Sequence, residues 1–234
     1  MIRERVLVWD GCVNVRDLGG LPLEGGGETS FGVVVRADSI GALTDAGWTA
    51  LRDYGVTAAV DLRGEHELED LGRQVNPIEI VSVPISPTSG PGWEWPSMLE
   101  AYLGVLEEFR PQFAAAVAAA AEAEPPVLIH CQGGRDRTGL LVALVLRCAG
   151  VDAETIAADH AISDDSWAPY NVAWFGEAAD EKERARRRRV ASPAGRTMVE
   201  VLDHVDRRHG GAREFLGGFS DDHLDRLVLR LRGD

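Results

Sequence analysis

The sequence predicts an α/β fold with a central, mostly parallel sheet flanked by helices. Three observations support this prediction. Short apolar runs typical of buried strands alternate with longer helical patterns. Gly and Pro residues mark the ends of several of these segments. No internal repeat or long linker interrupts the chain, so we expect residues 1–234 to form a single domain with additional helices at its C-terminal end.

The first half of the chain is predicted to contain three strands and two helices. The strands are Val33–Arg36, Val56–Asp61 and Ile78–Val83. Thr44 is expected to cap a helix that runs to about Tyr54 and is closed by Gly55. The stretch from Pro87 to Pro96 is dense in Pro, Gly, Ser and Trp, which predicts a loop. Met98–Glu122 carries a long, Ala-rich helical pattern.

The second half begins with a predicted strand at Val127–His130 and an apolar helix from Thr138 to Cys148. Asp152–His160 is predicted to be a short helix. A charged stretch, Glu177–Arg189, contains a basic cluster that we interpret as a solvated helix face, because acidic residues beside it offset its charge. The alternative is a surface that attracts polyanionic lipid headgroups or acidic phosphopeptides. Three more helices are predicted near Thr197–His209, Ala212–Leu216 and Asp221–Leu231.

The composition excludes several classes of function. The formal net charge of −14 leaves no broad basic surface for nucleic acid, and no apolar run is long enough for stable insertion into a membrane. The three cysteines, Cys12, Cys131 and Cys148, fit neither a disulfide framework nor a zinc site, so we expect no metal and a reducing compartment. The N-terminus lacks a signal-peptide pattern, which favours the cytoplasm, with secretion by another route as the alternative.

Residues 130–138, HCQGGRDRT, have the features of an anion-binding loop, which we call the phosphate loop. The preceding strand delivers His130 and Cys131 to the carboxyl edge of the sheet, where ligands bind in α/β folds. Gly133 and Gly134 let the backbone curl so that successive N–H groups point inward, and the next helix adds the positive charge of its N-terminus. This field favours the thiolate of Cys131, which predicts a nucleophile for phosphoryl transfer.

The rest of the phosphate loop is predicted to hold a phosphate group or another oxyanion. Arg137 can grip two phosphate oxygens with its planar fork, and the Thr138 hydroxyl can donate to the sulfur as it leaves. The alternative is a structural turn with a buried Cys and a salt-bridging Arg. The predicted phosphate-binding residues are Gln132, Gly133, Gly134, Arg135, Asp136, Arg137 and Thr138.

Three motifs in order resemble the bacterial protein tyrosine phosphatase family. HCQGGRDRTG, at residues 130–139, is similar to the signature HCxxGxxR followed by Ser or Thr. It is closest to HCxxGKDRTG of the branch that includes the secreted mycobacterial tyrosine phosphatase B, with Arg135 in place of Lys. NVRDLGG at residues 14–20 resembles NxRDLGG, and VDLR at residues 60–63 resembles DLR followed by a glutamate, here Glu65 or Glu67. The resemblance implies a phosphatase fold without metal or cofactor, acting on phosphotyrosine, with phosphoserine, phosphothreonine or phosphoinositides as alternatives.

The leaving group of such a reaction needs a general acid. Asp61 ends a strand predicted to lie near the phosphate loop, and its place in DLR resembles that of the acid in the related branch. Asp136, inside the loop, competes with it, and we place Asp61 ahead. The alternatives are a carboxylate paired with Arg63 or a loop amide for Asp61, and a salt bridge that braces the loop for Asp136. Trp95-Pro96-Ser97 resembles the Trp-Pro-Asp loop of tyrosine phosphatases, but Ser97 cannot act as an acid.

Further residues are predicted to support the site. His130 is expected to fix Cys131 by hydrogen bonding to the loop. The motif at residues 14–20 is expected to brace or line the pocket, and a plain tight turn is its competing interpretation. An aromatic wall of Trp93, Trp95 and Tyr102 could stack on a phosphotyrosine ring, against ordinary packing as the alternative. The predicted supporting residues are His130, Asn14, Arg16, Asp17 and Arg63.

The sequence therefore predicts a phosphate-monoester hydrolase that acts through a phosphocysteine at Cys131. One rival is a sulfurtransferase or arsenate reductase, which the motifs outside the phosphate loop oppose. The other is a catalytically inactive phosphate-binding module, which the presence of both Cys131 and Arg137 opposes.

Overall fold

A five-stranded sheet forms the centre of the computed structural model, which describes residues 4–69, 78–86, 95–192, 194–217 and 221–234. Its order is β1-β2-β5-β3-β4, and every neighbouring pair is parallel except β1 with β2. The predicted mostly parallel sheet is therefore confirmed. The strands are β1 (Arg16–Asp17), β2 (Val34–Ala37), β3 (Ala58–Asp61), β4 (Glu79–Ser82) and β5 (Val127–His130).

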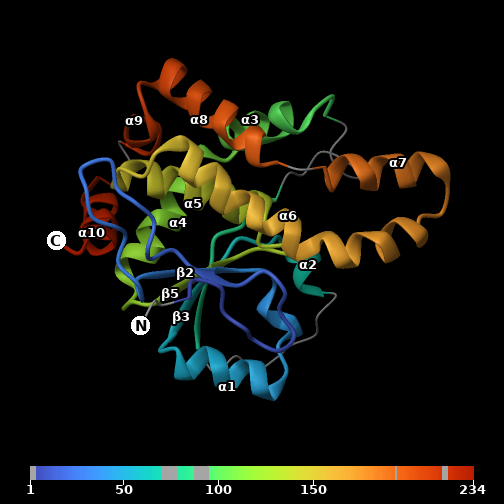
Figure 1. Ribbon diagram of the computed structural model, residues 1–234, viewed down its shortest axis with the longest axis horizontal. Helices are drawn as coiled ribbons and strands as arrows, with labels where there is room; N and C mark the ends of the chain where they lie inside the picture. Colours follow the sequence, from blue (N-terminus) through green and yellow to red (C-terminus); the bar gives the residue numbers. More distant parts are fainter. Residues whose placement is uncertain (1–3, 70–77, 87–94, 193, 218–220) are drawn as a thin grey trace.

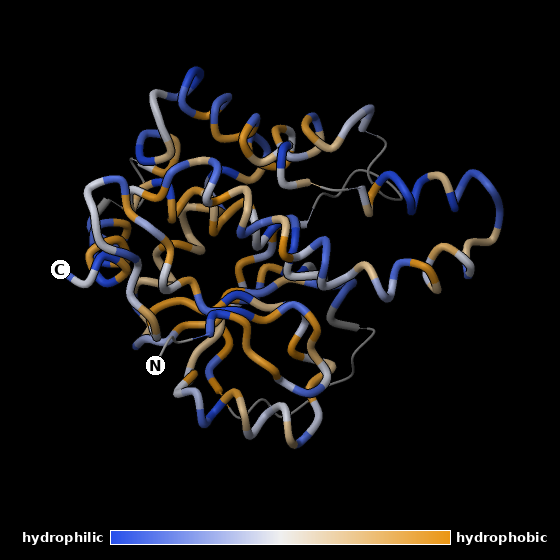
Figure 2. Tube along the Cα trace, in the orientation of Figure 1, coloured by the Kyte–Doolittle hydropathy of each residue, from blue (hydrophilic) through white to orange (hydrophobic). Residues whose placement is uncertain are grey.

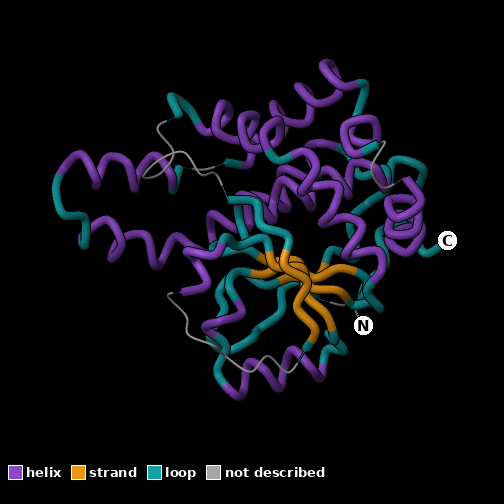
Figure 3. Tube along the Cα trace, turned by 180° about the vertical axis from the view of Figure 1, so that it is seen from behind, coloured by secondary structure: helices purple, strands orange, loops and turns teal. Residues whose placement is uncertain are grey.

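Helices cover both faces of this sheet (Figure 1). On one face lies α1 (Asp45–Asp53), whose N-cap Thr44 accepts a hydrogen bond from the Gly47 amide, as predicted. Figure 3 shows the strands between α1 and the larger helical layer. That layer contains α3 (Met98–Glu108), α4 (Arg110–Glu122), α5 (Asp136–Ala149), α6 (Ala153–Gly176), α8 (Gly195–His209), α9 (Ala212–Leu216) and α10 (Asp221–Arg232).

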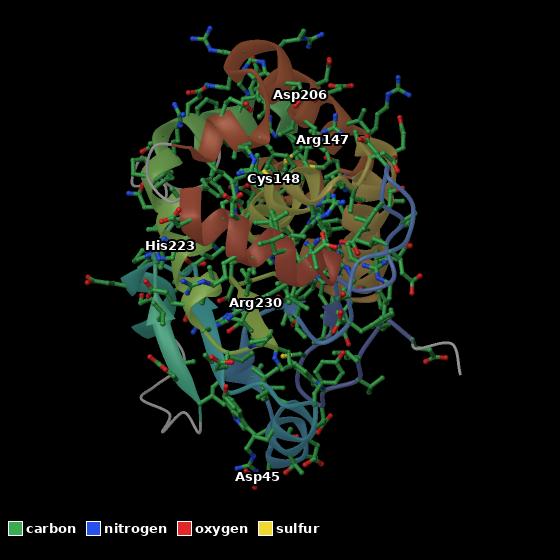
Figure 4. All side chains as sticks on the ribbon, turned by 90° about the vertical axis from the view of Figure 1, so that its left-hand side faces the viewer. Asp45, Arg147, Cys148, Asp206, His223 and Arg230 are labelled. Carbon is green, nitrogen blue, oxygen red and sulfur yellow. The ribbon has the colours of Figure 1, made fainter. Side chains whose placement is uncertain are left out.

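Two apolar cores, one on each face, follow from the alternation of side chains along the strands. Val34 and Ile129 face the larger helical layer, whereas Val35 and Leu128 face α1. Each fully buried side chain of this kind contributes roughly 1.5–3 kcal/mol to folding. Figure 4 shows the two sides of the molecule, with Asp45 on α1 at one end of the view and Arg147 beside Asp206 at the other. The sheet is thus packed against helices on both of its faces.

Two helix predictions are wrong in extent. The pattern over 98–122 forms two helices, because the first ends at Glu108 and the second begins at Arg110. Pro111 lies in the first turn of the second helix, where a missing N–H costs nothing. The helix predicted over Asp152–His160 runs to Gly176, and the interior Pro169 does not end it. Residues 87–94 of the predicted loop lie outside the described residues. Short elements that the sequence did not indicate are β1, a 3-10 turn (Ile40–Ala42) and α2 (Glu65–Glu69).

The distal part of α6 and the following α7 (Glu181–Val190) project from the globular body as a helical hairpin (Figure 1). Figure 2 shows that α7 is largely hydrophilic, and none of its residues is buried. Arg186 and Arg187 both bind Glu183, and Arg184 pairs with Glu181. The interpretation of this basic cluster as a solvated helix face is therefore confirmed.

A buried ion cluster ties α6 to the sheet. Asp159 accepts from Arg16 at 3.1 Å and from Arg36 at 2.9 Å, and Arg5 also contacts it. Burial alone would raise the pKa of Asp159, but the three guanidinium groups hold that pKa far below its usual range. The carboxylate stays ionised, and three buried or half-buried cations depend on it for their counter-charge.

We predict that Asp159→Asn destabilises the fold by about 3–5 kcal/mol at pH 7, because it leaves buried cations without a counter-charge. The folded-state pKa is depressed, so the contribution of Asp159 is fully present above the unfolded value of about 3.9 and is lost as the pH falls below it. Urea denaturation at pH 7 and pH 3 should show the deficit shrink at the lower pH. Asp165→Asn, at an exposed position of the same helix, is the control, and equal stability of the two variants would contradict the prediction.

Candidate active site

The phosphate loop lies at the carboxyl edge of the sheet, between β5 and α5, as predicted. β5 is an interior strand, and His130 at its end is paired with Ala37 of β2 on one side and with Asp61 of β3 on the other. The loop residues that follow reach α5 at Asp136. The sheet therefore fixes the start of the loop from two sides, and the helix fixes its end.

The carbonyl groups of the loop are held outward by surrounding donors. The carbonyl of Gln132 accepts from the backbone N–H of Ser39 at 3.1 Å. The carbonyl of Gly133 accepts from Asn14 Nδ2 at 2.9 Å and from Trp167 Nε1 at 2.8 Å. The indole donor comes from α6, in the part of that helix beyond the predicted end.

The next two carbonyls are held in the same way. Arg36 Nη2 donates to the carbonyl of Gly134 at 2.9 Å, and the amide of Gly139 donates to that of Arg135 at 2.8 Å. Because a trans peptide is planar, each outward carbonyl turns the following N–H to the opposite side. No hydrogen bond links the backbone N–H groups of residues 133–135 to any described residue. This arrangement is that of an anion-binding nest.

Gly134 is the residue that makes the curl possible. Its φ is +60°, and a Cβ built on it would lie 2.3 Å from the carbonyl oxygen of Ala37. Gly133 differs, because the nearest atom to its Cβ position is Trp167 Nε1 at 3.8 Å, an ordinary contact. Only Gly134 is therefore required by the local backbone.

Cys131 is 2% exposed, and its thiol is free. The buried Thr138 hydroxyl has no hydrogen-bond partner among the described residues, and neither has either ring nitrogen of His130. Burial lowers the pKa of His130 to about 4, although Asp61 opposes this shift. The imidazole is therefore neutral near pH 7, and its hydrogen bond to the loop stays a prediction.

Arg137 is held by Glu67 of α2 through two parallel hydrogen bonds, both of 2.6 Å. Burial would lower the pKa of Arg137, but the nearby Cys131 and Glu67 raise it above its usual range. The same guanidinium lies 3.4 Å from the carbonyl of Leu62. Its planar fork is thus fixed in one orientation before any ligand enters.

The side chain of Arg135 leads away from the phosphate loop. It donates to the carbonyl of Val190 at 2.6 Å and to that of Ser192, and it pairs with Asp164 at 2.7 Å. Its guanidinium therefore links the loop to the end of α7 and to α6. The predicted contact of Arg135 with an anion remains a prediction, and only its backbone N–H is free of these contacts.

Asp61 is bound on both carboxylate oxygens by Arg63, with distances of 2.6–3.1 Å. Burial would raise the pKa of Asp61, but the hydrogen bonds from Arg63 and the nearby His130 lower it below its usual range. The Arg63 fork also donates to the Ser39 hydroxyl at 2.8 Å. The carboxylate of Asp61 is therefore ionised and held in place by Arg63. This opposes our prediction that Asp61, ahead of Asp136, is the general acid.

Asp136 stands in the first turn of α5, next to Arg137, and about a quarter of its side chain is exposed. The hydroxyl of Tyr102 donates to its Oδ1 at 2.5 Å. Arg135 lies 3.9 Å away, beyond hydrogen-bond distance. Asp136 thus has one oxygen that a described residue holds and a second that none holds.

The N-terminal motif supports the loop from behind. Asn14 links the Gly133 carbonyl to Arg16, which donates to Asn14 Oδ1 at 2.7 Å and continues to Asp159. Asp17 has a different place, because its carboxylate accepts from the amides of Gly19 and Gly32 and from Tyr54. Asn14 and Arg16 brace the loop, whereas Asp17 braces the tight turn.

Three residues at the site were not found from the sequence: Glu67 as the partner of Arg137, Tyr102 as the donor to Asp136, and Trp167. The glutamate was named only as part of the DLR motif, and its contact depends on α2, which no periodicity indicated. Tyr102 was predicted for an aromatic wall, but it is fully buried. Of the other two members, Trp95 packs against Gly104 of α3, and Trp93 lies outside the described residues.

In the part of the chain that the structure describes, no group of three or more His, Cys, Asp and Glu side chains could hold a metal ion. The same part contains no helix that is long and apolar enough to cross a membrane.

Comparison with known proteins gives consistent matches over most of the chain. A family model described as "Tyrosine phosphatase family" matches residues 7–233. A tyrosine-protein phosphatase of Nostoc commune is 31% identical over 84% of this chain and 73% of its own. A relative from Cupriavidus necator is 29% identical over 97% of this chain and 87% of its own. The triple specificity protein phosphatase PtpB of Mycobacterium tuberculosis is 56% identical over 41 residues, 18% of this chain and 15% of its own.

We predict that Gly134→Ala abolishes anion binding by the phosphate loop, because the new Cβ would collide with the Ala37 carbonyl at a strained backbone conformation. Calorimetric titration with inorganic phosphate or vanadate measures the loss. Gly133→Ala is the matched control, with ordinary contacts at its Cβ, and a smaller loss is expected. Equal losses in the two variants would contradict the role of the Gly134 conformation.

Proposed function

Because the chain belongs to the tyrosine phosphatase family, we propose that it hydrolyses phosphate monoesters, with protein phosphotyrosine first among its substrates, through a phosphocysteine at Cys131. The single observation that carries this proposal is the orientation of the phosphate loop, whose carbonyls from Gln132 to Arg135 are all bonded outward. Inward N–H groups, the N-terminus of α5 and the fixed Arg137 then surround one phosphoryl group above the sulfur.

In the first step the Cys131 thiolate attacks phosphorus, and the phosphorus–oxygen bond to the leaving group breaks. The loop N–H groups and the Nε–Nη2 edge of Arg137, the edge that Glu67 leaves open, bind the three remaining oxygens, whose charge grows in the transition state. Glu67 contributes by holding the fork in place at 2.6 Å, so that little orientation entropy is lost on binding.

We propose Asp136, and not Asp61, as the general acid for this step. Asp61 is ionised, buried and bound on both oxygens, so it has no proton to give and no free oxygen to give it from. Asp136 has an oxygen that no described residue holds and stands beside Arg137, at the mouth of the loop. Its proton would pass from that oxygen to the bridging oxygen of the substrate as the latter leaves.

In the second step water attacks the phosphocysteine, and Asp136 takes up a proton from it. The sulfur leaves as a thiolate inside the anion nest. Thr138 is suited to stabilise it, because its buried hydroxyl has no partner among the described residues and retains a hydrogen to donate. Phosphate then leaves the loop, and the cycle closes without a metal or cofactor.

Two alternatives concern the substrate and the activity. A broader specificity, for phosphoserine, phosphothreonine or phosphoinositides, is favoured by the short match to a relative named as a triple specificity phosphatase. A catalytically inactive phosphate-binding module would use the same loop.

The thiols of Cys12, Cys131 and Cys148 are all free, and we place the activity in a reducing compartment such as the cytoplasm.

We predict that the wild type hydrolyses p-nitrophenyl phosphate and phosphotyrosine peptides in EDTA, and that Cys131→Ser abolishes both activities. Asp136→Asn should lower kcat/KM for phosphotyrosine by about 10²–10³-fold, because the leaving group then departs without a proton. Panels of phosphoserine peptides and phosphoinositide vesicles rank the substrates.

Asp61→Asn is the matched control for the acid. We expect it to reduce stability, since it weakens the pairing of Arg63, while the rate per folded molecule changes by less than about tenfold. A large loss of phosphotyrosine activity in Asp61→Asn and a small one in Asp136→Asn would reverse the assignment. A folded wild type without turnover on any of these substrates would leave the phosphate-binding module as the function.

A further inference from the structure

A chain of three hydrogen-bonding groups leads from the interior to the exposed carboxylate of Asp136. The hydroxyl of Tyr102, on α3, lies 2.5 Å from Asp136 Oδ1 on α5 and 3.3 Å from His160 Nε2 on α6. The Tyr102 and His160 rings meet edge to face, with centroids 5.9 Å apart. Both residues are at most 1% exposed, so solvent does not compete for the hydroxyl.

Packing holds the three hydrogen-bonded groups in place. A Cβ built on Gly139 would lie 2.5 Å from the His160 ring, so the imidazole fills the space that a side chain at this position of α5 would need. Tyr102 belongs to the same core cluster as the apolar side of α5. The hydroxyl is therefore held by its neighbours, and not by Asp136 alone.

Burial and the surrounding charges keep Tyr102 and His160 neutral. Burial and the nearby Asp136 raise the pKa of Tyr102 well above its usual value, against the opposing charge of Arg135 and with a further contribution from Asp164. Burial lowers the pKa of His160 well below its usual value, and Arg36, Arg135 and Arg16 act in the same direction against Asp159. Tyr102 thus has a proton to donate, and His160 carries no charge.

We propose that Tyr102, seated on His160, is a positioning residue for the general acid, an inference that depends on the proposed role of Asp136. The Tyr102 O–H occupies Oδ1, so the transferable proton must be carried by Oδ2, the oxygen free to face the leaving group. When that proton passes to the bridging oxygen, the phosphorus–oxygen electron pair goes with the leaving group and the sulfur–phosphorus bond forms. Tyr102 then donates to the carboxylate that remains.

His160 acts one step further back. Once the hydrogen of Tyr102 is committed to Asp136, the Tyr102 oxygen can still accept from the Nε2–H tautomer of His160, an assignment that follows from the hydrogen-bond pattern. This bond keeps the hydroxyl rotor pointing at Asp136. His160 is thus a second positioning residue and does not touch the substrate.

The leaving group provides the test, because a good leaving group needs little help from an acid and a poor one needs much. We would measure kcat/KM, which reports the steps up to the phosphocysteine, for p-nitrophenyl phosphate and for phenyl phosphate. The ratio of the two values is independent of the folded fraction of a variant. Asp136→Asn should raise the preference for p-nitrophenyl phosphate by roughly 10²-fold, and Tyr102→Phe by about tenfold.

Two further variants complete the experiment. Tyr170→Phe removes the same oxygen from a half-exposed tyrosine of α6 and should leave the ratio unchanged. His160→Gln should give a ratio between those of the wild type and Tyr102→Phe. In the Asp136→Asn background, Tyr102→Phe should have no further effect on the ratio, because the two residues act as one unit.

The possible outcomes separate the two proposals. If Asp136→Asn changes the ratio while Tyr102→Phe and His160→Gln do not, the positioning role is overturned and the acid assignment stands. If Asp136→Asn itself leaves the ratio unchanged, the acid assignment fails and the positioning role fails with it. An unaltered affinity of Tyr102→Phe for inorganic phosphate, together with a raised ratio, supports the proposal and excludes general damage to the loop.

Discussion

The outward orientation of four consecutive loop carbonyls is the constraint on which the rest of this structure depends. An anion can be held by backbone N–H groups only if the carbonyls between them have other partners, since a buried carbonyl without one costs about 1–3 kcal/mol. Arg36 supplies one such bond, to Gly134, and with its other nitrogen it binds Asp159. Asp159 also holds Arg16, which holds Asn14 on the Gly133 carbonyl. The buried ion cluster and the loop are therefore one network.

This network explains how a protein with a net charge of −14 can present a cationic site. Most arginines around the loop are matched by a carboxylate, with Arg16 and Arg36 on Asp159, Arg63 on Asp61 and Arg135 on Asp164. These paired side chains stabilise the fold around the loop but add no net positive charge to attract a phosphate. Arg137 is itself paired with Glu67, so the attraction for a phosphoryl group that we propose comes from the loop N–H groups and the N-terminus of α5, with Arg137 adding hydrogen bonds. A local field of this kind needs no basic surface elsewhere.

The sequence predicted what depends on local pattern and left out what depends on tertiary contact. The β5–loop–α5 unit was predicted correctly, because a buried strand, two glycines and an apolar helix are adjacent in the chain. The length of α6 was not predicted, because its distal half contains Pro169, a residue that usually ends a helix, and Trp167 was missed with it. Asp61 beside β5 was placed correctly from strand order. Its pairing with Arg63 was only the competing interpretation of the sequence, because the chain alone does not show which of two neighbouring groups the carboxylate faces; the observed pairing opposes an acid role for Asp61.

Placing the acid inside the phosphate loop has a mechanical consequence. Asp136 and Arg137 are neighbours in the first turn of α5, so the acid and the phosphoryl-binding group that we propose belong to one rigid element. No separate segment has to close in order to bring a carboxylate to the reaction. The precision then rests on the χ angles of a single short side chain, and a partly exposed carboxylate in water populates several of them. A buried hydroxyl that binds one of its two oxygens removes most of that freedom, which is why a tyrosine fixed deep in the helical layer belongs to the chemistry at the surface.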